Sequence, residues 1–162
     1  MLRFHVAISL VGLLTGFVVV YGLLTNQRLN KWTASFLVTT VATSVTGFLL
    51  PFPKLLPSHI FGFISLAVLA PAIIARYPKG LAGPWRWIYV VGASIALYLN
   101  SFVAIFQSFL KIPGLHSLAP TQSEPPFAIA QGALLVLFVL ITIGGLRKFH
   151  PEEKLGSRSA AA

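Results

Sequence analysis

Five long runs of apolar residues alternate with short polar segments along the chain. A helix needs about 20 apolar residues to cross the roughly 30 Å of hydrocarbon in a bilayer, and each run reaches or nearly reaches that length. The sequence therefore predicts an all-α fold, a polytopic integral membrane protein built as a five-helix transmembrane bundle. The expected spans are residues 6–25, 33–50, 59–76, 85–111 and 126–146.

The second and third runs are the shortest, and a connection containing Pro51, Pro53 and Pro57 joins them. An alternative interpretation treats these two runs as a re-entrant pair, which leaves three spans. The fourth run would be about 40 Å long at 1.5 Å per residue, so it must tilt or protrude from the bilayer.

Composition favours a membrane protein over a soluble one. Only 9% of the residues are charged and 56% are hydrophobic, with a mean hydropathy of +0.85, whereas about a quarter of a soluble domain is charged. Cysteine is absent, which excludes disulfides and thiolate sites. The net charge of +9 reflects Lys and Arg beside helix ends. We expect no binding to nucleic acid, because no basic stripe alternates with exposed aromatic residues.

One transmembrane domain is expected over residues 1–150, followed by a cytoplasmic tail over 151–162. The first run is expected to be a retained helix, because no small-residue cleavage site follows Leu24. Residues 156–162 have the composition of a cloning remnant and are left out of the functional interpretation.

Basic residues predict the orientation in the membrane. With five spans, eight Lys and Arg residues fall on one side and three on the other, and such an excess marks the cytoplasmic side. The N-terminus is therefore expected outside and the C-terminus in the cytoplasm of a bacterial inner membrane. The larger group is Arg28, Lys31, Arg76, Lys79, Arg86, Arg147, Lys148 and Lys154, and the smaller is Arg3, Lys54 and Lys111.

A polar seam is expected along the fourth helix. Asn100 and Gln107 are seven residues apart and so share nearly one face, while Ser101 belongs to a second row about 100° around the helix. An amide that faces lipid is costly, so the seam should point into the bundle. It serves either for hydrogen bonds between helices or as the lining for a polar ligand, a quinone headgroup or an ion.

Small and hydroxylated residues indicate where helices meet. Gly12 with Gly16, and Ala128 with Gly132, have the spacing that brings membrane helices into close contact. The second helix carries a row of hydroxyls whose protons can return to the carbonyl oxygen of the preceding turn. We interpret this row as packing in preference to a conduction path. Its members are Thr39, Thr40, Thr43, Ser44 and Thr46.

The predicted topology places His5, His59, His116 and Glu124 at the outer membrane face. Locally, Glu124 stands before two prolines, where a carboxylate suits a helix N-terminus. If these four side chains converge, they could hold a divalent metal, bind haem at its axial positions, or relay protons. No short spacing such as HxxxH supports a metal site.

No motif for phosphoryl transfer, hydrolysis or metal-dependent catalysis is present, and the chain lacks aspartate, so we expect no enzyme. The first hypothesis is a small inner-membrane protein that binds or passes a small polar or amphiphilic ligand or ion. The ligand would enter past His59, His116 and Glu124 into the seam of Asn100 and Gln107. The alternatives are a haem- or metal-binding protein, and an accessory subunit of a larger membrane complex. A homodimer is a further possibility.

Overall fold

The computed structural model describes residues 2–49 and 57–151, with the side chains of Leu2 and of residues 57–59 left out. The described residues are helical and contain no strand, which confirms the all-α prediction. The helices are α1 (Leu2–Leu24), α2 (Asn30–Leu49), α3 (Pro57–Arg76), α4 (Trp85–Lys111), α5 (Pro113–Leu118) and α6 (Pro125–Lys148).

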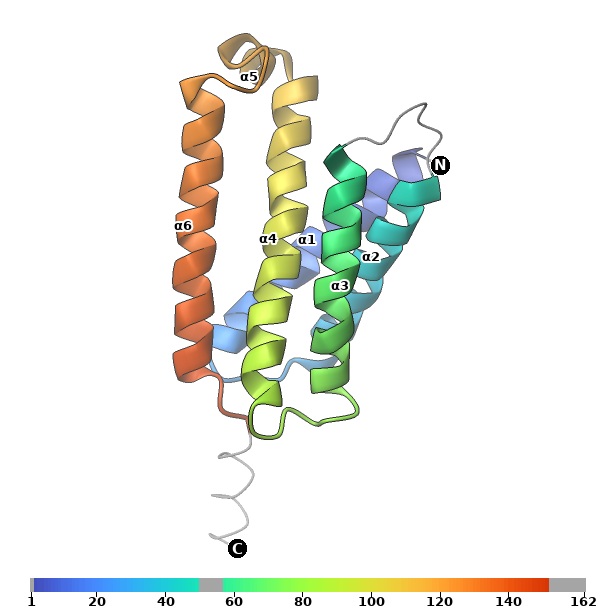
Figure 1. Ribbon diagram of the computed structural model, residues 1–162, viewed down its shortest axis with the longest axis vertical. Coiled ribbons are helices and arrows are strands. Elements are labelled where there is room, and N and C mark those ends of the chain that lie inside the picture. Colours follow the sequence, from blue (N-terminus) through green and yellow to red (C-terminus); the bar gives the residue numbers. More distant parts are fainter. Residues whose placement is uncertain (1, 50–56, 152–162) are drawn as a thin grey trace, which may run out of the picture.

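Five of these helices run alternately up and down, and the short α5 lies across the top of α4 and α6 (Figure 1). We call the end that carries α5 and the start of α1 the upper end. The lower end carries the connections from α1 to α2 and from α3 to α4, together with the end of α6. Helix α1 crosses obliquely behind the others, whereas α4 and α6 stand nearly parallel (Figure 1).

Helix α4 is the centre of the bundle, because it contacts α1, α3, α5 and α6. Small residues on its lower half allow this close packing. A methyl group on Gly92 would lie only 2.8 Å from the Cβ of Ala72 in α3, and Ala93 and Ala96 are almost fully buried. Close approach of this kind provides the van der Waals contact that associates helices in lipid.

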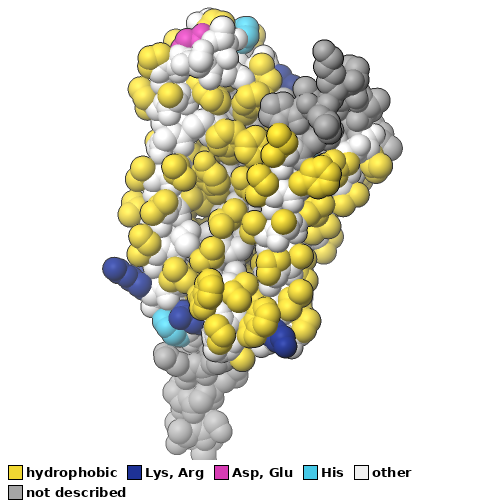
Figure 2. Space-filling model, viewed as in Figure 1, with side chains coloured by type: hydrophobic (Ala, Val, Ile, Leu, Met, Phe, Trp, Pro, Cys, Tyr) yellow, Lys and Arg dark blue, Asp and Glu magenta, His cyan; other side chains and the backbone are white. Residues whose placement is uncertain are grey.

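The outside of the bundle is apolar. Hydrophobic side chains cover the visible face between the two ends, and basic side chains gather mainly toward the lower end (Figure 2). Four helices, α1, α2, α4 and α6, are long and apolar enough to cross a membrane. The part of α3 with described side chains, Ile60–Arg76, is apolar but shorter. An exposed surface of this kind suits a bilayer and not water.

The helix bounds lie close to the expected spans, and Trp85–Lys111 coincides with residues 85–111. Helix α5 was not expected, because the sequence analysis treats the segment around His116 as a loop. Its six residues begin with Pro113 at the first helical position, and so short a helix leaves no periodic pattern to detect. The proline-rich connection at Pro51 and Pro53 lies outside the described residues.

The lower end is tied together by arginine side chains. Arg76 is 7% exposed and donates from Nη2 to the carbonyl oxygen of Arg28 at 2.6 Å and to Oδ1 of Asn30 at 2.7 Å. Its guanidinium lies 5.1 Å from the ring centroid of Tyr89. Arg86 donates to the carbonyl oxygens of Leu146 and Phe149, which lie at the end of α6. The two bonds of Arg86 satisfy carbonyl oxygens at the end of α6. Together with the two bonds of Arg76, they hold the helices together at the lower end.

Candidate functional site

A cavity of about 600 Å³ lies among α1, α2, α3 and α4 in the upper half of the bundle. Its wall follows α4 from Leu99 to Ile112, a length of about 20 Å at 1.5 Å per residue. At the upper end the wall includes Lys111 and Ile112, which are both exposed, and we call this end the mouth of the cavity. Pockets of this size accommodate small organic ligands.

Two predicted site residues, Asn100 and Gln107, line this cavity. Asn100 lies at its lower end and donates weakly, at 3.4 Å, to the carbonyl oxygen of Ser9 in α1. The Gln107 amide, two turns closer to the mouth, has no hydrogen-bond partner among the described residues. Ser101 is buried and does not line the cavity, and its hydroxyl also lacks a partner in the described part of the chain.

The hydroxyls that line the cavity are largely engaged within their own helices. Five of the six donate to a carbonyl oxygen three or four residues earlier, so their protons are used and their lone pairs remain. The sixth, Ser65 of α3, has no hydrogen-bond partner among the described residues. The wall therefore offers hydrogen-bond acceptors and few free donors. The side chains bonded in this way are Ser9, Thr40, Thr43, Ser44 and Ser108.

Lys111 and His5 stand at the mouth of the cavity. The Nδ1 atom of His5 lies 2.9 Å from the hydroxyl of Thr46, which joins the top of α1 to α2. Lys111 has no carboxylate partner within the described residues. In the sequence, Lys111 contributes to the predicted orientation and is not a predicted site residue. Its position four residues after Gln107 and eleven after Asn100 puts all three on one face of α4 and was an available signal.

The lower end of the cavity is closed by tight packing. At Gly12, an added Cβ would lie 3.2 Å from Nδ2 of Asn100, and at Gly16 it would overlap Leu97 and lie 3.0 Å from the ring of Phe36. Leu97 and Phe36 are each 1% exposed. The predicted contact at Gly12 and Gly16 is therefore present between α1, α2 and α4. Gly132 differs, because nothing lies within 4 Å of an added Cβ there.

The predicted outer cluster does not assemble from the residues that can be placed. His5 lies on α1 beside α2, whereas His116 lies on α5, where Nδ1 is 3.3 Å from the carbonyl oxygen of Phe109. Within the described residues no group of three or more His, Cys, Asp or Glu side chains could hold a metal ion. The side chain of His59 lies outside the described residues. His5, His116 and Glu124 thus do not form the expected metal site by themselves, and the binding of haem by a histidine pair stays a prediction.

Glu124 has a local structural role. Its carboxylate accepts hydrogen bonds from the backbone N–H groups of Thr121 and Ser123 and from the Thr121 hydroxyl, at 2.8 to 3.1 Å. Partial desolvation acts to raise the pKa of Glu124, but these hydrogen bonds outweigh it, so the pKa lies below its ordinary value. The carboxylate holds the turn before α6 and lies away from the cavity wall.

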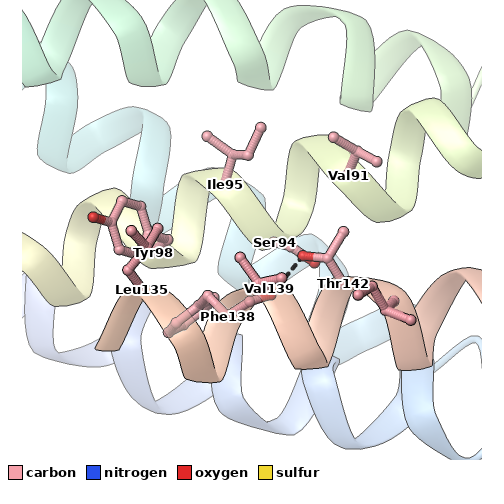
Figure 3. A pocket seen from close by; sticks show the side chains of 9 residues that line it. Val91, Ser94, Ile95, Tyr98, Leu135, Phe138, Val139 and Thr142 are labelled. Atoms are coloured by element: carbon pink, nitrogen blue, oxygen red, sulfur yellow. Dashed lines mark hydrogen bonds between the residues drawn. The ribbon is translucent and has the colours of Figure 1, made fainter. Parts of the chain in front are cut away.

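A second, smaller hollow of about 240 Å³ lies between α4 and α6 on the surface of the bundle (Figure 3). Ile95, Leu135, Phe138 and Val139 give it an apolar wall. The hydroxyl of Thr142 donates to the carbonyl oxygen of Phe138 at 2.7 Å and is thereby occupied (Figure 3). This hollow offers no specific polar recognition, so the cavity among α1 to α4 is the candidate site.

Comparison with models of protein families, with curated proteins and with solved structures found no match to this chain. The functional interpretation therefore depends on the geometry of the cavity and on its charges.

Proposed function

We propose that the chain crosses a bacterial inner membrane five times, with α3 as the additional span and the upper end outside. The exposed basic residues at the lower end support this orientation, because Lys and Arg concentrate on the cytoplasmic side. Exposed aromatic residues at that end, Tyr21, Trp32, Tyr77 and Trp87, suit the headgroup zone. The exposed residues are Lys31, Lys79, Arg147 and Lys148, and at the same end Arg28 and Arg86 are half-buried and Arg76 is buried.

The protein binds a small amphiphilic ligand that enters the cavity from the outer face. The observation that carries this proposal is the cavity itself, which joins a polar mouth at His5, Gln107 and Lys111 to apolar walls at Leu13 and Val103. A ligand with one polar end and one apolar part matches both surfaces. Asn100 and the helix hydroxyls add acceptors at the lower end, which can orient a polar group on the apolar part.

Binding is favoured over passage across the membrane. Below the cavity, Phe36 and Leu97 fill the space beside Gly16 with almost no exposed surface. At the lower end, Arg76 adds a buried positive charge that opposes the movement of cations. A ligand in the cavity therefore meets tightly packed side chains at the lower end, which supports binding over passage across the membrane.

Photolabelling of the protein in lipid nanodiscs tests this function. The probe is a palmityl alcohol that carries a diazirine in its chain, and the labelled residues are mapped by mass spectrometry. We expect labels on cavity residues such as Val103 in the wild-type protein. Ala104→Trp fills the cavity and should remove these labels, whereas Val136→Trp changes an exposed position of α6 that lines neither the cavity nor the smaller hollow and should leave them.

Labels confined to surface residues such as Leu140 in the wild-type protein would refute the proposal, as would equal cavity labelling in both tryptophan variants.

A further inference from the structure

The hydrogen-bond donors and charges around the cavity indicate which chemical class of amphiphile binds there. We propose that the ligand is a single-chain amphiphile with an anionic head, a carboxylate or a phosphate ester, held at Lys111 and Gln107 with its chain directed toward Asn100. This inference rests on the proposed function, because it concerns the ligand of the same cavity.

The charge at the mouth is positive, and no described residue pairs with it. Lys111 lines the cavity, and the one acidic residue in the described part of the chain, Glu124, is engaged by Thr121 and Ser123. A cation at the edge of the low-dielectric interior is stabilised by an anion that lies beside it. An anionic headgroup provides that partner, whereas a cationic ligand would be repelled.

Hydrogen-bond donors show where the head should lie. Along the lower wall, the hydroxyl protons of Thr40, Thr43 and Ser44 are used within α2, so these groups present lone pairs, which disfavour an anion. Ser65 of α3 offers a single neutral hydroxyl without a partner among the described residues, whereas the Lys111 ammonium and the Gln107 amide at the mouth offer several such donors, those of Lys111 being charged. Hydrogen bonds between these donors and a charged oxygen are the strong kind.

The shape of the cavity indicates where the hydrocarbon chain of the ligand lies. From the mouth the wall extends about 20 Å along α4, past Val103 to Leu99, and this length suits an extended hydrocarbon chain. Its volume of about 600 Å³ lies within the range of sites for small ligands, which favours one chain over the two of a bilayer phospholipid.

The experiment uses the full chain in nanodiscs of phosphatidylcholine, which has no net charge. A diazirine-bearing palmitic acid is compared with the matched palmityl alcohol, and unlabelled palmitate or lauryl phosphate serves as competitor. We expect the acid to label cavity residues at least tenfold more strongly than the alcohol, because charge-assisted hydrogen bonds are worth roughly that factor or more. If palmitate competes and lauryl phosphate does not, the head is a carboxylate, and the reverse result identifies a phosphate.

Lys111→Gln should reduce labelling by the acid about tenfold and leave labelling by the alcohol unchanged, and Lys111→Arg should retain the preference. Lys31→Gln is the matched control, because Lys31 is an exposed lysine at the opposite end of the bundle. Equal labelling by acid and alcohol, unaffected by Lys111→Gln, would overturn the anionic ligand and leave the binding function standing. Absence of cavity labelling by either probe would overturn both.

Discussion

The floor of the cavity gives the sharpest quantitative prediction. Gly16 in α1 faces Leu97 of α4 and Phe36 of α2, and an added methyl group would overlap the first and lie 3.0 Å from the second. Both neighbours are 1% exposed, so neither side chain has free volume into which it can move. Gly16→Ala should therefore force α1 away from the bundle or strain the two side chains.

Overpacking of this kind costs about 1–3 kcal/mol. Alanine also favours a helix over glycine by up to about 1 kcal/mol, which partly hides the cost. Gly132→Ala corrects for this gain, because it makes the same change in α6 where nothing lies within 4 Å of the new methyl group. We expect Gly16→Ala to be less stable than Gly132→Ala by about 1–3 kcal/mol.

Unfolding in mixed micelles, with helicity followed by circular dichroism, measures this difference. The free energies of unfolding of the wild-type protein and of both variants are compared under the same detergent conditions. A difference below about 0.5 kcal/mol between the two variants would show that α1, α2 and α4 do not meet at Gly16. It would also remove the barrier below the cavity on which the preference for binding over passage depends.

Two further predictions concern the lower end and the orientation. Arg76→Met should lower the free energy of unfolding by about 2–4 kcal/mol, because the Arg28 carbonyl and the Asn30 side chain lose a charged donor. Lys79→Met, at an exposed lysine above the ring of Trp85, should cost less than about 1 kcal/mol, and equal losses would contradict the role given to Arg76. For the orientation, the cysteine-free chain allows single cysteines at Ser117 and Ala82, both exposed at opposite ends. A membrane-impermeant maleimide should label Ser117→Cys and not Ala82→Cys in intact cells, and the reverse pattern would invert the topology.

The sequence predicts helices well because the signal is long. Each apolar run spans many residues, so an error of a few residues at either end changes little, and α4 from Trp85 to Lys111 matches its run. Helix α5 has only six residues and carries no such signal. Helix α3 has twenty residues, Pro57–Arg76, but its side chains are described only over Ile60–Arg76, so its apolar stretch is shorter than those of its neighbours.

Contacts between helices were harder to predict than the helices themselves. The spacing of Asn100 and Gln107 places them on one face, and both line the cavity, but spacing cannot say that Ser101 lies buried elsewhere. The predicted topology places His5 and His116 at one membrane face, but among the described residues they do not form a metal-binding group with Glu124, since His116 lies on α5 beside Phe109 and His5 bonds to Thr46 of α2. Glycine spacing was equally ambiguous, since Gly16 is tightly packed and Gly132 faces open space.

In the proposed complex, an amphiphile replaces water in the cavity. Water at the mouth can form hydrogen bonds with Gln107 and Lys111, but the side chains of Leu13, Leu99 and Val103 offer it none. A hydrocarbon chain against these three side chains would remove apolar surface from water, which is favourable. The proposed ligand would therefore gain from both surfaces, with its chain along the apolar wall and its head at Lys111.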